Sequence, residues 1–354
     1  MKIKLAILEK DQNYLNRFVS SFSTKYSDKF EIYSFTNQDV ALSTLESSKI
    51  DIFMANDAFD VDVRQLPKRC GFAYLVDSID VESLNNQRAI GKFQRVDLIY
   101  KQILSIYSEK AGSMSGLKMG DDTARVVAFQ SISGGCGGST MAAACALHYA
   151  ALGKKTLYLN LEKFGSSDVF FSAEGQFSMS DIIYALKSKN VNLALKLESS
   201  VKMDPRGVYF FSAPAFALDM MELKTDELVR LVSELRLTGS YDVIVLDLDF
   251  SINKEELQIL DQAQVVVWVG DGSEISNTKL YRAYGAVSIM DQQGDSSLLG
   301  RLALVYNKFS NKTSRSMDDL GIRMIGGSQR YEHATTAMVL EQLVRKDVFD
   351  KIFA

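Results

Sequence analysis

The fold is decided by residues 126–150, which read VVAFQSISGGCGGSTMAAACALHYA. The stretch begins with an apolar run typical of a β-strand, up to Gln130, and continues as an alanine-rich helical pattern that starts near Gly138. Four of the five residues at 134–138 are glycines, which permit positive φ and close approach of the backbone to a ligand. Such a loop, followed by a helix N-terminus, directs backbone N–H groups at an anion. The stretch therefore predicts a phosphate-binding loop, and the alternative is a plain glycine turn.

Strand-like apolar runs alternate with longer helical patterns on both sides of this loop, which predicts parallel α/β sheets. In the first third of the chain the expected strands cover residues 3–8, 30–33, 50–54, 72–76 and 88–90. From the loop onward they cover residues 125–130, 156–161, 208–211, 243–247, 265–269, 301–306 and 324–325. Between the two series, residues 108–123 (SEKAGSMSGLKMGDDT) are rich in glycine and serine, as linkers are. We expect two doubly wound domains, 1–110 and 123–354, joined by a linker at 111–122.

The composition excludes several classes of function. The 354 residues include 40 basic and 44 acidic side chains, a net charge of -4, which argues against a broad nucleic-acid-binding face. No apolar run has the length of a membrane-spanning helix, and the charged N-terminus is not that of a signal peptide, so we expect a cytoplasmic protein. Three cysteines suit reduced thiols, and two histidines are too few for a histidine-based metal site or a Ser-His-Asp triad.

The loop resembles the deviant Walker A motif of the MinD/ParA ATPases, Lys-Gly-Gly-x-Gly-Lys-Thr/Ser-Thr/Ser. Its glycines and its final hydroxyl pair match, but Ser133 and Gly138 stand where the family has lysines. The resemblance implies that ATP and Mg²⁺ are bound here, with the hydroxyl of Ser139 on the metal. The implied nucleotide-binding residues of the loop are Gly134, Gly135, Cys136, Gly137, Gly138, Ser139 and Thr140. Removing one electrostatic stabiliser typically costs roughly two to three orders of magnitude in rate, so we expect binding with little or no hydrolysis.

Two further motifs of this resemblance would complete the metal site. The apolar strand YDVIVLDLD at 241–249 is similar to the Walker B strand, which implies that Asp247 is associated with Mg²⁺. LYLNLEK at 157–163 falls where the family carries Asp-x-Asp, and the pair here is Asn160 and Glu162. Glu162 is the candidate catalytic residue, because it could orient a water molecule; the alternative is a solvated surface acid.

A third motif concerns the nucleotide base. LALVYNKFS at 302–310 resembles the family strand that ends in Asn-Lys or Asn-Arg and helps to hold adenine. The resemblance implies that Asn307 and Lys308 bind the cofactor, since an amide can both donate to and accept from a purine edge. The alternative is an asparagine that forms a turn after a strand.

The first 110 residues resemble a receiver domain of the CheY type. Glu9 and Asp11 follow the first strand, and Lys92 fits the lysine that follows the fifth. Asn56 stands at the phosphoacceptor position, and an amide cannot form an acyl phosphate. We therefore expect a degenerate receiver that serves as a docking or dimerisation module; the alternative is phosphorylation of Asp57, one residue later.

The last segment, 335–354, carries apolar residues on one helical stripe. It would either pack on the core or bind a membrane surface, and its balanced charges favour the core.

A degenerate receiver followed by an atypical MinD/ParA ATPase is similar to the TadZ/CpaE proteins of tight-adherence (Flp/type IVb) pilus systems. The resemblance implies a homodimer stabilised by ATP and Mg²⁺ that localises the pilus and secretion machinery, with partners recruited through the receiver-like domain. It implies a cytoplasmic protein, polar or peripheral to the inner membrane, with any membrane association indirect and no nucleic acid bound. The alternative is a slow MinD-like cycling ATPase, in which Lys163 or Lys154 replaces the missing lysines.

Overall fold

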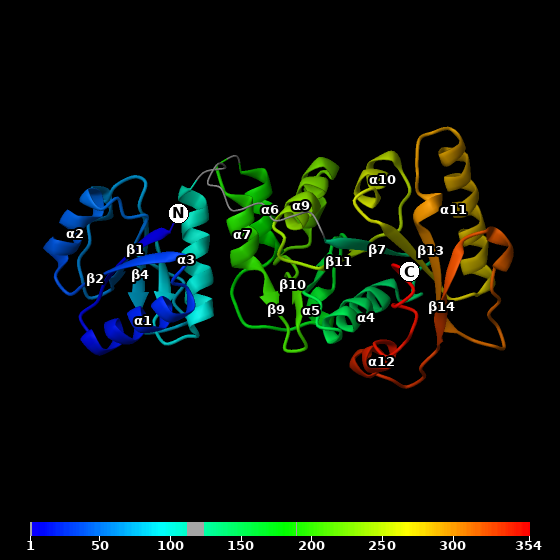
Figure 1. The fold of residues 1–354 in the computed structure, drawn as a ribbon, viewed down its shortest axis with the longest axis horizontal. Coiled ribbons are helices and arrows are strands. Elements are labelled where there is room, and N and C mark those ends of the chain that lie inside the picture. The colour runs from blue at the N-terminus through cyan, green and yellow to red at the C-terminus, as the bar shows by residue number, and fades with distance from the viewer. Residues whose placement is uncertain (1, 112–123, 189) are drawn as a thin grey trace. The chain divides into compact units, whose positions relative to one another are not determined.

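The computed structural model of the chain describes residues 2–111, 124–188 and 190–354. It divides into two compact units (Figure 1). The first comprises Met1–Ser115 together with Ser188–Ser200, and the second comprises Gly116–Lys187 and Val201–Ala354. Apart from residue 111, the expected linker at 111–122 lies outside the described residues. The domain boundaries at 110 and 123 therefore stay a prediction.

The first unit is built on a six-stranded sheet in the order β2-β1-β3-β4-β6-β5. Its strands are β1 (Ile3–Leu8), β2 (Phe30–Phe35), β3 (Ile52–Asn56), β4 (Gly71–Val76), β5 (Ser83–Leu84) and β6 (Gln87–Gly91). All pairs are parallel except β5 with β6. Without the short edge strand β5, the order is the 2-1-3-4-5 arrangement of CheY-like doubly wound folds. The expected receiver-like sheet is confirmed, and β5 is an addition that the apolar pattern did not predict.

Helices cover the two faces of this sheet unequally. The helices are α1 (Gln12–Lys25), α2 (Gln38–Ser47) and α3 (Val96–Lys110). Side chains of α1 and α3 pack into one core, and α2 packs into the other. Residues 57–70 and 77–86, all of them described, contain a short 3-10 turn and β5 but no α-helix. The connections after β3 and β4 are therefore irregular, where helices were expected to separate most strands.

One further helix, α7 (Leu193–Ser200), joins the first unit from the middle of the chain. The buried side chain of Leu195 completes the core formed by α1 and α3. The carboxylate of Glu198 accepts a hydrogen bond from the Tyr100 hydroxyl at 2.7 Å and pairs with Lys29. Lys196 is only 1% exposed, and its ammonium donates to a serine hydroxyl of α3 at 2.8 Å. The first unit is therefore complete only with residues that lie far along the sequence.

The second unit contains an eight-stranded sheet in the order β14-β13-β12-β7-β11-β8-β10-β9. Its strands are β7 (Arg125–Ser131), β8 (Thr156–Asn160), β9 (Lys202–Met203), β10 (Val208–Phe210), β11 (Val243–Leu248), β12 (Val265–Gly270), β13 (Leu302–Phe309) and β14 (Arg323–Gln329). All pairs are parallel except β9 with β10. The first strand of the unit, β7, lies between β11 and β12, and this central switch point is where doubly wound sheets bind ligands. The fold class of two parallel α/β sheets is confirmed, and only β9 was not foreseen here.

The helices of the second unit are α4 (Gly138–Ala151), α5 (Ser167–Phe170), α6 (Met179–Lys187), α8 (Leu218–Met221), α9 (Thr225–Leu237), α10 (Lys254–Leu260), α11 (Glu274–Gln292) and α12 (Thr336–Leu343). The alanine-rich α4 is buried along most of its length, because its small side chains let it pack closely on the strands. Beside it lies α12 (Figure 1). The C-terminal segment packs on the core, as expected, through buried Leu340, Val348, Phe349 and Ile352. The expected stripe is not one helix, however, because α12 ends at Leu343.

None of the described helices is long and apolar enough to cross a membrane.

Candidate functional site

The glycine-rich loop connects the carboxyl end of β7 to α4, as the sequence predicts. Gly135 and Gly137 have φ values of 81° and 84°, in the left-handed region that disfavours side chains. Gly134 and Gly138 do not have positive φ, so the expected positive φ is found at two of the four glycines. The loop ends at Gly137, directly before the first turn of α4, where backbone N–H groups have no acceptor within the helix.

A serine side chain lies at one of the two positions that lack lysine and another lies beside the second. The Ser133 hydroxyl lies 2.8 Å from the buried sulfur of Cys136. The Oγ of Ser131 accepts a hydrogen bond from the Gly138 N–H at 3.0 Å. A Cβ atom at Gly138 would lie 2.3 Å from that Oγ, so a lysine here would have to displace it. The loop is thus packed around glycine at this position, a role of Ser131 that no motif in the sequence indicates.

Five polar side chains meet at the carboxyl ends of β8 and β11, beside the start of α4. Asp247 Oδ2 accepts hydrogen bonds from the Tyr158 hydroxyl at 2.6 Å and from Asn160 Nδ2 at 2.9 Å. Asn160 Nδ2 also lies 3.0 Å from Glu162 Oε2, and Ser139 Oγ donates to the same carboxylate at 3.2 Å. Since Asp247 pairs in register with Asn160, the parallel sheet itself brings these motifs together. We call Ser139, Glu162 and Asp247 the oxygen cluster.

The electrostatics of the oxygen cluster favour a cation. Asp247 is 1% exposed; burial, and then the charge of Glu162, raises the pKa of its carboxyl from 3.8 to about 7. A divalent cation would offset that penalty, and hydroxyl and carboxylate oxygens are the donors that Mg²⁺ prefers. The described residues contain no group of three or more His, Cys, Asp or Glu placed for a metal ion. Ser139 and Asp247 therefore fit Mg²⁺ that takes its other ligands from water and phosphate.

Glu162 does not lie on a solvated surface, which was one of its two interpretations. It is half-buried, and both of its carboxylate oxygens lie 3.2 Å from Ser139 Oγ. The interpretation as an acid that orients a water molecule stays a prediction. The sequence did not indicate Tyr158, although its position two residues before Asn160 on β8 puts both side chains on the same face of the sheet.

The structure places Asn307 and Lys308 at the end of β13, against the glycine-rich loop. Asn307 Nδ2 donates to the Cys136 carbonyl, and Lys308 Nζ donates to the Gly135 carbonyl, each at 2.8 Å. Contact of either residue with adenine stays a prediction. Of the two lysines considered as substitutes, Lys163 follows β8 at the carboxyl edge of the sheet, whereas Lys154 precedes β8 at the opposite edge. Lys154 is therefore too far along the strand to serve the loop of its own chain.

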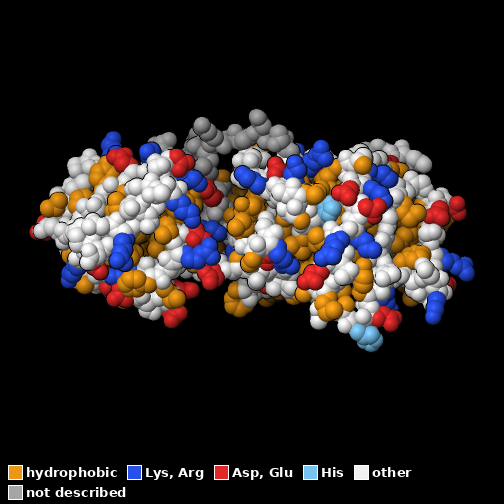
Figure 2. Space-filling view, turned by 60° about the horizontal axis from the view of Figure 1, so that its bottom comes forward, with side chains coloured by type: hydrophobic (Ala, Val, Ile, Leu, Met, Phe, Trp, Pro, Cys, Tyr) orange, Lys and Arg blue, Asp and Glu red, His pale blue; other side chains and the backbone are white. Residues whose placement is uncertain are grey.

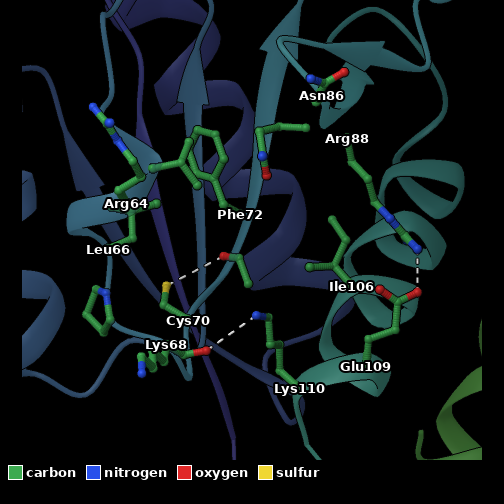
Figure 3. Close-up of a pocket in the computed structure, with 14 residues that line it drawn as sticks. Arg64, Leu66, Lys68, Cys70, Phe72, Asn86, Arg88, Ile106, Glu109 and Lys110 are labelled. Carbon is green, nitrogen blue, oxygen red and sulfur yellow. Dashed lines mark hydrogen bonds and ion pairs between the residues drawn. The ribbon is translucent and has the colours of Figure 1, made fainter.

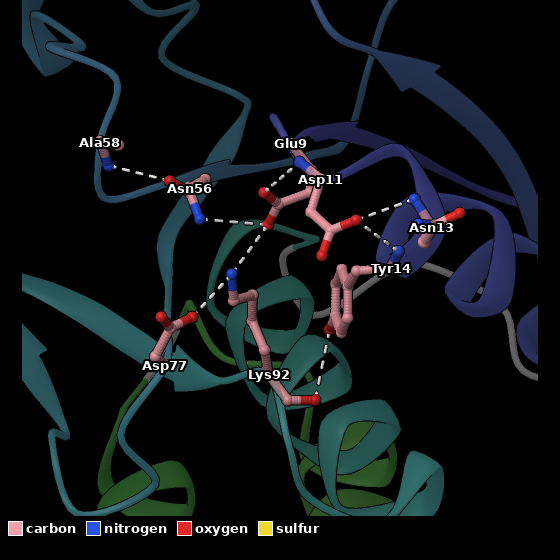
Figure 4. Close-up of polar contacts among 8 residues, drawn as sticks. All are labelled: Glu9, Asp11, Asn13, Tyr14, Asn56, Ala58, Asp77 and Lys92. Carbon is pink, nitrogen blue, oxygen red and sulfur yellow. Dashed lines mark hydrogen bonds and ion pairs between the residues drawn. The ribbon is translucent and has the colours of Figure 1, made fainter.

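The receiver-like unit carries a cluster of polar side chains at the corresponding edge of its sheet (Figure 4). Glu9 is 1% exposed, and its Oε2 accepts from Asn56 Nδ2 at 3.1 Å and lies 3.3 Å from Lys92 Nζ. Lys92 also pairs with Asp77 at 2.7 Å. Burial acts to lower the pKa of Lys92, but Asp77 and Glu9 outweigh it and raise the pKa. The carboxylate of Glu9 is thus held by an amide and an ammonium group, and the exposed Asp57 lies outside these contacts.

A groove of about 510 Å³ lies elsewhere in the first unit, at the amino end of β4 and beside α3 (Figure 3). Basic side chains line it, among them Lys68, Arg88 and Lys110. Arg88 pairs with Glu109, and Lys110 donates to the Lys68 carbonyl at 3.3 Å. Because these contacts already hold two of the cations, the groove is a weaker candidate than the glycine-rich loop.

Comparison with known proteins found one matching family model and several similar structures. Residues 1–108 match the family model described as "TadZ-like, receiver domain". No curated protein matches the chain. Its structure is similar to that of a ParA family ATPase from Chlorobium tepidum TLS, with a TM-score of 0.52 and 20% identity over 66% of this chain and 99% of that chain.

A second similar structure is the septum site-determining protein MinD from Pyrococcus horikoshii OT3, complexed with Mg-ADP. Its TM-score is 0.49, with 14% identity over 65% of this chain and 98% of that chain. At these identities, structural similarity reports the fold and not the chemistry. Residues 1–108 are thus similar to a TadZ-like receiver domain, and the chain also contains the fold of a ParA family ATPase, which agrees with the resemblance found in the sequence.

Proposed function

We propose that this protein binds ATP with Mg²⁺, forms a nucleotide-stabilised homodimer, and positions the machinery of a tight-adherence pilus system with little or no hydrolysis. The observation that carries the proposal is the glycine-rich loop beside the oxygen cluster. The loop offers backbone N–H groups to a polyphosphate, and Ser139 and Asp247 offer ligands to its metal ion. Phosphate binding through backbone N–H groups and metal binding through oxygen ligands do not require the two missing lysines.

The proposed lack of efficient hydrolysis follows from residue identity at two positions. Ser133 and Gly138 carry no charge where phosphoryl transfer concentrates negative charge. The second candidate function, a slow cycling ATPase, is favoured by one observation: Glu162 faces Ser139 rather than bulk solvent. An acid in that position could orient water, provided that another cation stabilises the transition state.

The proposed homodimer is supported by apolar side chains exposed near the carboxyl edge of the sheet. Phe164, Phe216 and Leu218 are 72%, 72% and 70% exposed. The segments that carry Phe164 and Phe216 follow β8 and β10, and residues of both segments line one small cavity with Glu162. Exposed aromatic side chains beside a ligand site are typical of interfaces. The face drawn in Figure 2 has basic and acidic side chains interspersed with such apolar ones, which suits a protein partner better than a nucleic acid.

The role in pilus assembly rests on the TadZ-like receiver domain at residues 1–108. Its polar cluster has an amide at the acceptor position, and Lys92 pairs with the buried Glu9, so we propose that it recruits pilus and secretion proteins through its surface instead of accepting phosphate. The proposed location is cytoplasmic, polar or peripheral to the inner membrane, with membrane association through partners.

One experiment tests the core of the proposal. ATP and ADP binding, turnover and molar mass are measured on the same purified protein, with Mg²⁺ and with EDTA. We expect Mg²⁺-dependent binding, a dimer with ATP and negligible turnover. Turnover that is lost in Asp247→Ala would favour the cycling ATPase, and absence of any binding or change of mass would refute both candidates.

A further inference from the structure

The end of β13 contacts the back of the glycine-rich loop through two adjacent side chains. Asn307, 2% exposed, donates to the Cys136 carbonyl, and the exposed Lys308 donates to the Gly135 carbonyl. Lys308 has a φ of 55°, and the pairing of β13 with β14 shifts register at this point. A non-glycine residue in the left-handed region persists only where its surroundings require it. We infer that the left-handed backbone of Lys308 is maintained by its surroundings, among them the contact between its ammonium group and the loop.

These two hydrogen bonds orient two successive peptide groups. In a trans peptide the C=O and the following N–H point in opposite directions, and no described peptide bond is cis. Because β13 holds the carbonyls of Gly135 and Cys136, the N–H groups of Cys136 and Gly137 face away from β13, and that of Cys136 donates within the loop to the Ser133 carbonyl at 3.4 Å. The fit is close: a Cβ atom at Gly137 would lie 2.6 Å from Asn307 Nδ2 and 3.5 Å from Lys308 Cε. The loop and the end of β13 thus pack so closely that no side chain fits at Gly137.

The charge of Lys308 also lies where the loop is short of positive charge. Ser133 and Gly138 are neutral, while the Lys308 ammonium lies 2.8 Å from the backbone of the same loop. A charged donor on a carbonyl makes a stronger hydrogen bond than a neutral one and polarises the peptide, which here strengthens the hydrogen bond from the Cys136 N–H to the Ser133 carbonyl that shapes the loop.

We propose that Lys308 is the cation that compensates for the two missing loop lysines, acting from behind the loop. Together with Asn307 it fixes the two carbonyls toward β13, so that the Gly137 N–H faces the polyphosphate of the bound nucleotide while the Cys136 N–H closes the turn onto Ser133, and its positive charge adds to the attraction for phosphate. This inference rests on the proposed function, since it concerns the same nucleotide site. It makes Lys308 a positioning residue for phosphate, whereas the sequence resemblance assigned it to the base.

The test separates phosphate from base by comparing ligands. Binding of ATP, ADP and adenosine is measured with Mg²⁺ for the wild type, Lys308→Met, Lys308→Arg and the control Lys312→Met, an exposed lysine in the following turn. Loss of a charged hydrogen bond predicts that Lys308→Met weakens ATP and ADP about tenfold and adenosine less than about twofold. Lys308→Arg should retain ATP affinity within about threefold, and Lys312→Met should match the wild type.

A second variant guards against misfolding. Lys308→Gly suits the left-handed backbone, so it removes the ammonium group without adding strain, and we expect the same loss of ATP affinity with an unchanged melting temperature. Equal losses for adenosine and ATP would assign Lys308 to the base and overturn the inference. Unchanged ATP affinity in the Met and Gly variants would overturn it while leaving the proposed function intact. A wild type that binds none of the three ligands would instead refute the proposed function, and this inference with it.

Discussion

Replacing Asp247 by asparagine should stabilise the protein in the absence of metal and nucleotide, and only at neutral or higher pH. Burial and the neighbouring Glu162 raise the pKa of Asp247 in the folded state from 3.8 to about 7. Between these values the folded protein keeps a proton that the unfolded chain has released. Stability therefore falls as pH rises through this interval, because the unfolded state binds fewer protons. Below about pH 4 both states are protonated, and the penalty is absent.

The size of the stability change follows from the shift in the pKa of Asp247 between the unfolded and the folded state. A change from 3.8 to about 7 corresponds to about 4 kcal/mol, at about 1.4 kcal/mol for each pH unit. Asparagine removes the charge but keeps an oxygen that accepts from Tyr158 and Asn160. We therefore expect Asp247→Asn to raise the free energy of unfolding by about 2 to 4 kcal/mol near pH 8 and by less than about 1 kcal/mol near pH 4.5.

The assay is urea denaturation in EDTA without nucleotide, followed by the fluorescence of Trp268. This residue is the only tryptophan of the chain, and it is fully buried in β12. Asp226→Asn, at an exposed carboxylate of α9, is the control and should have little effect at either pH. A gain of equal size at both pH values, or a loss near pH 8, would refute the reasoning. By the proposed function the same variant loses Mg²⁺-dependent ATP binding, so stability and function would move in opposite directions.

Three further changes test other parts of the structure. Gly138→Lys alone should lower the free energy of unfolding by about 2 kcal/mol, because its Cβ meets Ser131 Oγ; a double-mutant cycle with Ser131→Ala should recover about 1 kcal/mol, and strictly additive losses would contradict the clash. Lys92→Met leaves a buried carboxylate without its cation and should cost about 3 kcal/mol in urea denaturation, whereas Lys68→Met at the surface should cost little. Leu195→Ala should cost about 2 to 3 kcal/mol and speed hydrogen exchange in α3; unchanged exchange there would count against α7 as part of that core.

Much of the fold could be predicted because its signals are periodic and local. Buried parallel strands give continuous apolar runs, so most strands were found with their ends displaced by one to three residues. The exceptions, β5 and β9, have two residues each and pair antiparallel at sheet edges, where no apolar run is needed. The connections after β3 and β4 were also missed, since amphipathic patterns there are too short to distinguish a helix from an irregular loop.

The candidate site could be predicted only as far as its motifs extend. The loop, Ser139 and Asp247 lie in short stretches with strong residue preferences, and the parallel register then brings them together. Ser131 and Tyr158 were missed because their roles depend on which neighbours share a face of the folded sheet. The same holds for the contact of Lys308 with Gly135, which joins residues 173 positions apart. Contacts of this kind depend on the tertiary fold, and no local pattern encodes them.

The placement of α7 has a consequence for how the protein is made. The ribosome releases the strands and helices of the first unit well before residues 193–200, which complete its core. During that interval the surface of α3 that Leu195 covers is open to chaperones or to other nascent chains. The first unit cannot mature in strict order from the N-terminus, but must wait for part of the second half to be synthesised. A fragment that ends at residue 111 is therefore an unfinished form of this unit, and its recombinant expression should require α7 to be supplied.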